Sequence, residues 1–520
     1  MLSRLAGGFA LALVLAACAP ATAPQPQPGA AGVPTAERRA AVQVLRVAQI
    51  GLPATLSPES SASNISLYGA MYDPLTWLDG KNNVLPWAAT RWEQVEPTTW
   101  RFTLRRDLTF SNGDKLTADD VEFTLNLIVE TRMPQTSQVI NLVGAKKVDE
   151  YTVDVMTRVR DASVVAGLLY CWIMPKSYYT QVGKNGFAVK PIGSGPYELV
   201  EFRANDIAVF RKRATEHPFR KAIATELTFR SIVEQTQMAS GLRTGELDIL
   251  QGLLSPDIVE TIAKTDAKVD YRTTSNISAL ISQPEMMMRN TPLQDKRVRW
   301  ALNYAVDKEA IAKNLFRGYA IPTGQLSVPH SPSWDDSIKP IPYDPARAKQ
   351  LLAEAGYPNG FKLPVGIEFT PQTVNPNIAT AIQANLRDVG IDAPVTAYEL
   401  AAFLDKYYGR NNQVKGDLFL QSTSDVNGFF TQIQGLYSCS NALHWWCNPE
   451  FDRLMQQANG EPDVAKRAEI MRRAIRVFYD DVAHINLIVS SVFLITSPKI
   501  RGFVWDNPFF FVYDNAYKVE

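Results

Sequence analysis

Histidines are the first residues to consider for chemistry, because imidazole acts as a general base and as a metal ligand near neutral pH. None of them stands in a His-Glu-x-x-His pattern or in another spacing typical of a metal site, and a single histidine is more often a surface or core residue. The four are His217, His330, His444 and His484. The sequence therefore predicts no metal site and no cofactor.

Patterns for nucleophilic catalysis and phosphate binding are also missing from the sequence. It has no Gly-x-Ser-x-Gly motif and no P-loop. Residues 193–197 are rich in glycine, but Pro196 stands where a phosphate-binding loop needs a backbone N–H, so we expect a tight turn before a strand. Acidic pairs at 119–120 and 335–336 fit helix ends better than a catalytic dyad. We predict no enzyme; a secreted hydrolase whose catalytic residues are distant in sequence is the alternative.

Two cysteines have a spacing that suits a local disulfide. Cys439 and Cys447 are eight residues apart around a polar loop, and such a pair bonds readily in an oxidising compartment. A zinc site is the alternative, but it lacks a second cysteine pair with histidine partners. Cys171 lies in an apolar run and is expected to be a buried, unreactive residue.

Aromatic residues are abundant: the chain has 10 Trp, 19 Tyr and 23 Phe. Large flat side chains suit both a core and an adaptable ligand cleft. Trp445 and Trp446 lie inside the expected disulfide loop, which makes them candidates for a cleft, although core or lid packing fits them as well.

Strands are expected where apolar and polar residues alternate or where apolar residues cluster. Residues 44–50 alternate weakly, and residues 100–105 alternate with Trp100, Phe102 and Leu104 on one face. Residues 485–496 form an apolar run interrupted by polar residues, which predicts one or two buried strands rather than a membrane span. Shorter strands are expected at 190–200 and 224–231.

Helix ends are marked by capping residues, prolines and glycines. The expected helices are amphipathic, and with the scattered strands they indicate an α/β protein. Caps are expected at Thr117 before a helix at 119–129, at Asp307 before a helix ending near Gly318, at Asp344 with Pro345, and at Asn448 with Pro449; further helices are expected at 295–304 and 463–479.

The amino terminus indicates export. Residues 1–17 combine Arg4, a short apolar run and small residues before Cys18, which resembles the lipobox of bacterial lipoproteins. This resemblance implies that Cys18 is lipidated and becomes the first mature residue; a plain secretory peptide is the alternative. Residues 18–42 are rich in Ala, Pro, Gln and Gly and are expected to form a flexible tether.

Length and composition exclude several classes of protein. The chain has 520 residues, 53 basic against 53 acidic residues, and 46% hydrophobic residues. These values fit a multi-domain globular protein and exclude a disordered chain, a coiled coil and a collagen-like fibre. The balanced charge argues against a nucleic-acid partner.

Several stretches together resemble one family, because they occur in the family's order across residues 45–505. The stretches are 100–114 with 116–121, 191–197, 245–248, 295–307, 344–361 and 446–452. They are similar to the extracytoplasmic solute-binding proteins of family 5, the peptide/nickel-type ABC importers that include the dipeptide- and oligopeptide-binding group. The resemblance implies an α/β, bilobed, periplasmic-binding-protein-like flytrap (type II) with an additional domain inserted in lobe I.

The same resemblance implies a domain organisation. Lobe I is expected at 43–64, 189–285 and 486–520, the extra domain at 65–188, and lobe III at 286–485. The two strands that cross between lobes are expected near 286–290 and 483–489.

The family's ligand anchor is an Asp in a Trp-x-Gly-Asp stretch of lobe III, and Asp425 falls on this position in residues 421–430. Ser422 stands where the family has Trp, and no Asp-Pro follows, so a turn-forming role beside Asn427 is the alternative for Asp425. The other ligand-binding candidates are Ser422, Thr423, Asn427, Tyr68 and Trp445.

The resemblance implies a lipid-anchored, extracytoplasmic binding component of an ABC importer. We expect it to capture peptides by lobe closure and to deliver them to a membrane permease with its ATPase subunits. A non-peptide solute, such as a nickel chelate, an oligosaccharide or an opine-like compound, is the alternative. We expect a monomer, bound to a bacterial membrane through its lipid and located in the periplasm or at the cell surface.

Overall fold

The computed structural model describes residues 43–60, 65–80, 83–281, 291–371, 373–408, 416–424, 437–439, 446–505 and 511–520. The expected export signal, Cys18 and the tether lie outside these residues, as do Asp425, Asn427 and Trp445. Within the described ranges, no helix has both the length and the apolar character that a membrane-spanning helix needs.

One large mixed sheet organises the described chain. β13 (Ala320–Pro322) pairs with β19 but is not part of the continuous strand order of this sheet. Along that path the order is β17 (Val395–Ala397), β15 (Ile367–Phe369), β18 (Leu418–Ser424), β12 (Lys268–Ile281), β19 (His484–Thr496), β11 (Ile249–Gly252), β1 (Val44–Gln49), β10 (Glu226–Ser231), β9 (Ile207–Lys212) and β8 (Tyr197–Arg203).

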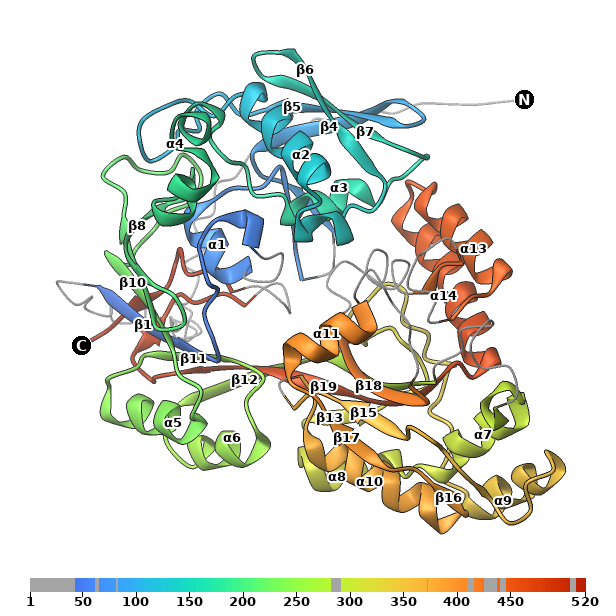
Figure 1. Cartoon of the computed structure of the whole chain (residues 1–520). Helices are drawn as coiled ribbons and strands as arrows, with labels where there is room; N and C mark the ends of the chain where they lie inside the picture. Colours follow the sequence, from blue (N-terminus) through green and yellow to red (C-terminus); the bar gives the residue numbers. More distant parts are fainter. Residues whose placement is uncertain are drawn as a thin grey trace, which may run out of the picture. The chain divides into compact units, whose positions relative to one another are not determined.

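The long strands β12 and β19 belong to both halves of this sheet. They run antiparallel side by side, from the pair Lys268–Thr496 to the pair Leu280–His484 (Figure 1). The end of β19 also pairs with β11, whereas the end of β12 pairs with β18. The apolar run at 485–496, which was expected to form one or two buried strands, forms a single strand. The strand expected near 286–290 lies outside the described residues. Within the described chain, β12 and β11 pair with β19 on its two sides.

In the first half of the sheet, β1 runs parallel to both β10 and β11. Two helices follow these strands, α5 (Gln235–Thr244) after β10 and α6 (Pro256–Ala263) after β11. Their apolar residues, including Met238 and Val259, form a core with Ala48 and Phe493 of the sheet. Since parallel strands end at the same edge, the ends of β1 and β11 lie next to each other.

In the second half of the sheet, helices cover both faces. One face packs against α7 (Lys296–Ala305), α8 (Lys308–Phe316) and α10 (Pro376–Asp388), with α9 (Pro345–Glu354) against α7. The other face contributes Phe419 to a core with α11 (Leu400–Tyr408), α13 (Pro449–Asn459) and α14 (Val464–Asp481). The caps expected at Asp307, Asp344 and Asn448 each accept a backbone N–H from the first turn of the helix that follows. The structure shows the same cap at Asp295 and at Asp463.

A separate four-stranded antiparallel sheet has the order β4 (Ala89–Glu96), β5 (Thr99–Leu104), β7 (Thr152–Thr157), β6 (Leu142–Asp149). The predicted alternation is confirmed, because Trp100, Phe102 and Leu104 are buried. Helix α2 (Ala118–Thr131) begins after Thr117, as expected, and packs on β6. Nearby lie α1 (Ile65–Met71), α3 (Val164–Gly167) and α4 (Lys176–Val189).

The prediction of a strand at 190–200 is wrong for residues 190–196. Pro191 and the turn at 193–196 precede the strand, and β8 begins at Tyr197. The physical reason is that proline lacks the N–H that a strand ladder needs. The remaining short pairs are β2 (Thr76–Leu78) with β3 (Val84–Pro86), β14 (Phe361–Lys362) with β16 (Ile391–Asp392), and β20 (Ile500–Arg501) with β21 (Tyr517–Lys518).

Candidate functional site

A cavity of about 880 Å³ lies where the ends of β1 and β11 meet the long strand β19. Its walls come from segments that are far apart in sequence, near both ends and in the middle of the chain. The lining includes residues 49–51, 65–67, 251–256, 373–375 and 490–493, together with Val233, Gln235, Ile277, Phe316, Tyr319, Pro371, Ser422 and Phe511.

The strand ends contribute carboxamides to this cavity. The Nε2 atom of Gln251 donates to Oε1 of Gln49 at 2.6 Å, and Nε2 of Gln49 donates to the carbonyl oxygen of Gly51 at 2.9 Å. The Tyr513 hydroxyl donates to Oε1 of Gln251. Gly51 and Gly252 line the cavity and have φ values of 84° and 121°, a region that favours glycine. Gly252 is the last residue of β11, and Gly51 comes two residues after the end of β1. The carboxyl ends of parallel strands are a common place for ligand sites.

An aromatic group forms another part of the wall. The ring centroids of Tyr319 and Phe493 are 5.1 Å apart, and Tyr271 lies 5.1 Å from Tyr319. Phe316 lines the cavity beside them, at the end of α8. These rings hold the wall in place, because edge-to-face aromatic pairs pack with defined geometry.

Ser422 and Thr423 point to opposite faces of β18. Ser422 pairs in register with Ile277 of β12, and both residues line the cavity. Thr423 pairs with Asn276, is buried, and is not a lining residue among those described. This difference follows from the alternation of side chains along a strand. Asp425, three residues after Ser422, and Asn427 lie outside the described residues.

Tyr68 is a core residue, which differs from the expected place in the cleft. Its side chain is buried, its hydroxyl donates to the carbonyl oxygen of Ser57 at 3.3 Å, and it lies 3.1 Å from the Ser60 hydroxyl. Burial raises the pKa of Tyr68 to about 12. On the same helix, Ile65 and Ser66 line the cavity, because a helix directs successive side chains to different faces.

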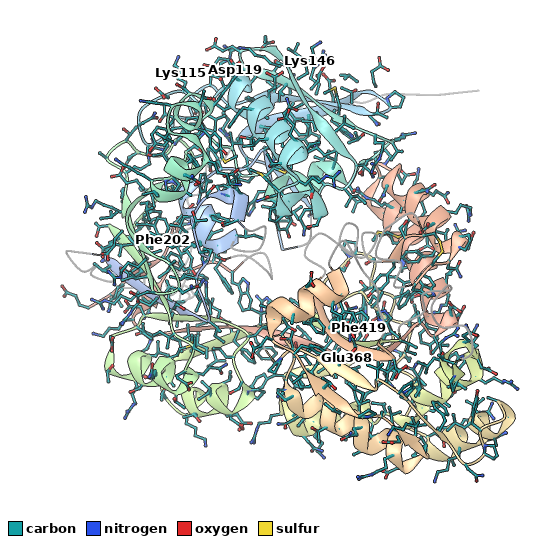
Figure 2. All side chains as sticks on the ribbon, viewed as in Figure 1. Lys115, Asp119, Lys146, Phe202, Glu368 and Phe419 are labelled. Atoms are coloured by element: carbon teal, nitrogen blue, oxygen red, sulfur yellow. A yellow bond between two sulfur atoms is a disulfide. The ribbon has the colours of Figure 1, made fainter. Side chains whose placement is uncertain are left out.

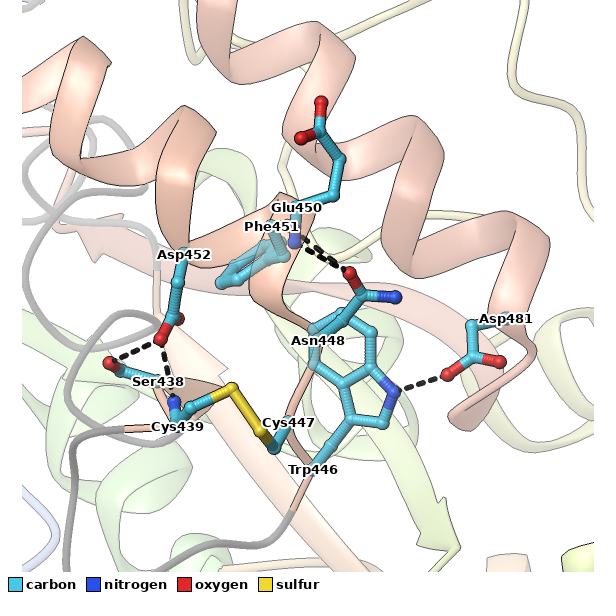
Figure 3. Close-up of a disulfide and its surroundings, with 9 residues drawn as sticks. All are labelled: Ser438, Cys439, Trp446, Cys447, Asn448, Glu450, Phe451, Asp452 and Asp481. Atoms are coloured by element: carbon cyan, nitrogen blue, oxygen red, sulfur yellow. Dashed lines mark hydrogen bonds between the residues drawn. A yellow bond between two sulfur atoms is a disulfide. The ribbon is translucent and has the colours of Figure 1, made fainter.

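The cysteine pair forms a disulfide between Cys439 and Cys447 (Figure 3). Next to it, Oδ2 of Asp452 accepts the backbone N–H of Cys439 at 2.9 Å. Trp446 is buried against Phe478, with Nε1 donating to Asp481 at 2.6 Å, so Trp446 is a core residue. Trp445 lies outside the described residues. Cys171 is buried and unpaired with another cysteine, and burial raises the pKa of its thiol to about 12, as expected for an unreactive residue.

A buried ionic cluster around Asp73 contains serine, histidine and aspartate. The Ser194 hydroxyl donates to Oδ2 of Asp73 at 2.8 Å, and Nε2 of His217 lies 3.0 Å from the same oxygen. A catalytic triad needs the histidine on the serine hydroxyl rather than on a shared carboxylate. The cluster therefore has a structural arrangement, and it gives the hydrolase alternative no support.

A second buried carboxylate, Glu368 of β15, lies beside Phe419 of β18 (Figure 2). It accepts hydrogen bonds from Tyr398 at 2.5 Å, from Lys406 at 2.5 Å, and from Tyr407. Burial and the neighbouring carboxylate raise the pKa of Tyr407. Among the described residues, no group of three or more His, Cys, Asp or Glu side chains is arranged to hold a metal ion.

Residues 83–442 match the family model described as bacterial extracellular solute-binding proteins, family 5 middle. The chain belongs to this family. Its members are solute-binding proteins rather than enzymes, and this places the chain among the binding components of ABC importers. The expected family and the expected periplasmic-binding-protein fold are therefore confirmed.

Relatives and solved structures agree with this assignment. The heme-binding protein A of Haemophilus influenzae is 26% identical over 507 residues, covering 91% of this chain and 90% of that protein. The dipeptide-binding protein of Escherichia coli is 26% identical over 476 residues, covering 86% and 88%. The periplasmic binding protein DppA of Helicobacter pylori, solved with the peptide STSA, shares the fold with a TM-score of 0.77, 22% identity, and coverage of 92% and 98%.

Sequence reasoning missed most of the cavity lining. Gln49, Gln251, Tyr319 and Phe493 belong to no motif. One available signal was the position of Gln49 at the end of an expected strand, because residues that follow parallel strands gather at one edge. No sequence signal relates Tyr319 to Phe493, since packing brings them together.

Proposed function

We propose that this protein captures peptides for an ABC importer and hands them unaltered to the permease and its ATPase subunits. The observation that supports this proposal is the cavity of about 880 Å³ in a family 5 fold, lined by residues from 49 to 511. Its volume falls in the range of about 300–1,000 Å³ that is typical of small-molecule sites.

Capture works by closure of two lobes around the peptide. Lobe I comprises residues 43–64, 189–285 and 486–520, the extra domain comprises 65–188, and lobe III comprises 286–485. A peptide that contacts both lobes binds the closed form better than the open form, and this difference in affinity shifts the population toward closure. The hinge consists of a few residues at the point where β12 and β19 pass from one half of the sheet to the other. Their backbone dihedral angles change as the lobes close.

Asp425 anchors the α-amino group of the peptide. The support for this role is that Ser422, three residues earlier in the chain, lines the cavity. A carboxylate that loses water when lobes close needs a cation, because an unpaired buried charge is strongly unfavourable. The ammonium group of a peptide supplies that cation. Thr423 and Asn427 flank the anchor, and Trp445 lies in the loop closed by the disulfide.

The protein acts at the outer face of a bacterial membrane as a lipid-anchored monomer. A lipid on Cys18 and the tether at 18–42 keep the binding domain close to the permease and raise its effective concentration there. One acyl chain binds a membrane weakly, so stable anchoring needs more than one chain.

A thermal-shift screen of the mature protein tests the peptide proposal. We expect di- to pentapeptides to raise the melting temperature, because a ligand that binds the folded state stabilises it. Stabilisation by sugars, opines or metal chelates, without any effect of peptides, would replace the peptide with a non-peptide solute. Turnover of a stabilising compound would indicate the hydrolase.

The role of Asp425 has a separate test. Asp425→Asn should weaken binding of a free-amine peptide by at least tenfold and change binding of its N-acetylated form much less, as measured by calorimetry. Asp266→Asn is the matched control, because Asp266 is exposed and is not among the described lining residues. Equal losses for both peptides would remove Asp425 from the anchoring role.

A further inference from the structure

We propose that the solute is uncharged and apolar where it meets the described wall of the cavity. This inference rests on the proposed function, because it names the chemical class of the compound that the binding cavity takes. The class is a solute that presents alkyl or aryl groups and hydrogen-bond acceptors, but no carboxylate, to this wall, such as a C-amidated peptide of apolar residues.

Exposed apolar side chains at the cavity are the first argument. Ile50, Val233 and Leu253 line it and are 44%, 71% and 48% exposed. They follow β1, β10 and β11, so they gather where these parallel strands end. Exposed apolar residues that cluster in this way mark a binding surface rather than chance exposure.

Aromatic side chains of the lining continue this apolar surface. Phe316, Tyr319, Phe493 and Phe511 line it, together with Val374 and Val492. Covering such a surface with an apolar group of a ligand removes both surfaces from water, which favours binding. A fully polar solute gains nothing from these contacts.

The polar groups of the described wall are neutral. They are carboxamides and hydroxyls: Gln49, Gln235, Gln251 and Asn375, with Ser66, Ser255, Thr373, Ser422, Ser490, Ser491 and Tyr319. Several are already engaged, since Gln251 and Gln49 bond to each other and Oε1 of Gln235 accepts the backbone N–H of Ser255 at 2.7 Å. This leaves Nε2 of Gln235 as a donor for a carbonyl or ether oxygen of the solute.

An anion on the solute would be poorly matched to this wall. A carboxylate that leaves water without a cationic partner loses several kcal/mol of solvation, and neutral amides recover part of it. A carbonyl oxygen at the same place needs one hydrogen bond and carries a much smaller desolvation penalty. The wall therefore selects amides, esters or ethers over carboxylates.

A matched pair of fluorescent probes tests this inference without a peptide. N-phenyl-1-naphthylamine is uncharged, whereas 8-anilinonaphthalene-1-sulfonate has the same rings and one sulfonate. We expect the full mature chain to bind the uncharged probe at least tenfold more tightly, as measured by fluorescence titration. Equal or tighter binding of the sulfonate would overturn the proposal.

A single substitution tests whether the preference belongs to this wall. Leu253→Lys places a cation at a half-exposed lining position and should reduce the preference for the uncharged probe at least threefold. Val148→Lys is the control, because Val148 has a similar exposure of 47% on β6, is not among the described lining residues, and should leave both affinities unchanged. A Leu253→Lys protein with an unchanged preference would overturn the proposal.

Four forms of one dipeptide separate this inference from the peptide proposal. Leu-Leu is tested free, N-acetylated, C-amidated, and blocked at both ends, each as a competitor of the uncharged probe. Removing the carboxylate should strengthen competition at least tenfold, with or without the free amine. If no form competes while the probe preference holds, the wall chemistry stands and the peptide function fails. If the free dipeptide binds more tightly than its amide, the peptide function stands and the uncharged class fails.

Discussion

Two buried polar regions of this protein satisfy their hydrogen bonds in different ways. In the first region, the side chains of Ser194, His217, Arg220 and Trp87 contact the carboxylate of Asp73, and Arg220 also pairs with Asp514. In the second, the face of β12, β18 and β19 opposite to Ile277 carries neutral side chains whose acceptor atoms have no partner in the described structure. The stability of the first region therefore depends on paired charges, whereas the second region tolerates buried neutral groups that lack some of their hydrogen bonds.

In the first region, every charge has an opposite partner. Asp73 lies 3.2 Å from Arg220, which also pairs with Asp514 at 2.8 Å, and Trp87 donates to Asp73 at 2.9 Å. Burial alone would raise the pKa of Asp73, but His217, Arg220 and Ser194 outweigh it and hold this pKa well below its usual range. The cluster joins segments near 73, 220 and 514, so it fixes parts of the chain that are distant in sequence.

In the second region, the side-chain amide N–H groups donate hydrogen bonds, whereas the side-chain oxygens of the same residues accept none in the described structure. Asn276 donates to the carbonyl of Gln325 at 2.8 Å, Asn486 to that of Gly324 at 2.9 Å, and Gln421 to the Tyr437 hydroxyl at 2.6 Å. Their side-chain oxygens are buried without a partner, as are the Thr423 hydroxyl and Nε2 of His484. A neutral group in this state costs about 1–3 kcal/mol, whereas an unpaired charge costs more.

Breaking the charged cluster should have the largest effect. Asp73→Asn removes the buried carboxylate that Arg220 and His217 contact, and we expect a loss of about 3–5 kcal/mol in the free energy of unfolding. Urea denaturation at pH 7 measures it. Asp154→Asn is the control, because the Arg101–Asp154 pair is partly exposed and should cost no more than about 1 kcal/mol. Equal losses for both variants would contradict the comparison.

The effect of Asp73→Asn should depend on pH. A carboxyl whose pKa is lowered by folding contributes stability above its unfolded pKa of about 4, and this contribution is lost as pH falls toward the folded value. The difference between wild type and variant should therefore be constant from pH 7 to 5 and shrink below about pH 4. A difference that grows on acidification would mean that Asp73 is protonated in the folded state.

Because of His484, the stability that the second region contributes should begin to fall at a higher pH than the stability that Asp73 contributes. Burial holds its pKa well below the usual value, so below about pH 6.5 the unfolded chain takes up a proton that the folded chain excludes. Wild-type stability should fall by up to about 1.4 kcal/mol for each pH unit below 6.5 through this residue. In His484→Phe, which keeps a ring against Tyr437 and Phe478, this part of the slope should disappear. An unchanged slope would show that His484 titrates normally.

The smallest effect is expected at Asn486. Asn486→Leu loses one hydrogen bond to a carbonyl but also removes a buried, unpartnered oxygen, so the stability should change by no more than about 1 kcal/mol. Asn141→Leu is the contrast, because Asn141 donates to the buried carboxylate of Asp161 at 2.9 Å and should cost about 2 kcal/mol. Thermal and urea unfolding measure both. A large loss at Asn486 would mean that its oxygen has a partner in solution.

Local features of the fold could be predicted from the sequence. The caps Thr117, Asp307, Asp344 and Asn448 predict helix starts, because a cap acts on N–H groups within one turn. Proline follows Asp344 and Asn448 at a position that suits the same place. The alternation of Trp100, Phe102 and Leu104 with polar residues predicts a strand, because it places the three side chains on one face. The ordered motifs also identified the family, which the match to residues 83–442 confirms.

The candidate site could be predicted only in part. Ser422 lines the cavity, whereas Thr423 and Tyr68 point elsewhere, because a shift of one residue on a strand or helix changes the face. The strand expected at 190–200 begins later because the turn at 193–196 overrides local β preference. Gln49 and Phe493 were not candidates, since their roles arise from the pairing of β1 with β11 and of β11 with β19.

The sequence by itself determined the family, the class of fold, the helix ends and the absence of known catalytic motifs, because these depend on residues that are close in the chain. The tertiary structure decided which side chains form the cavity and that its described wall is neutral. Its residues lie between positions 49 and 511, and the pairing of distant strands and the packing of helices and loops against them bring these residues together. Local signals have a range of a few residues, whereas a binding site is an arrangement in space.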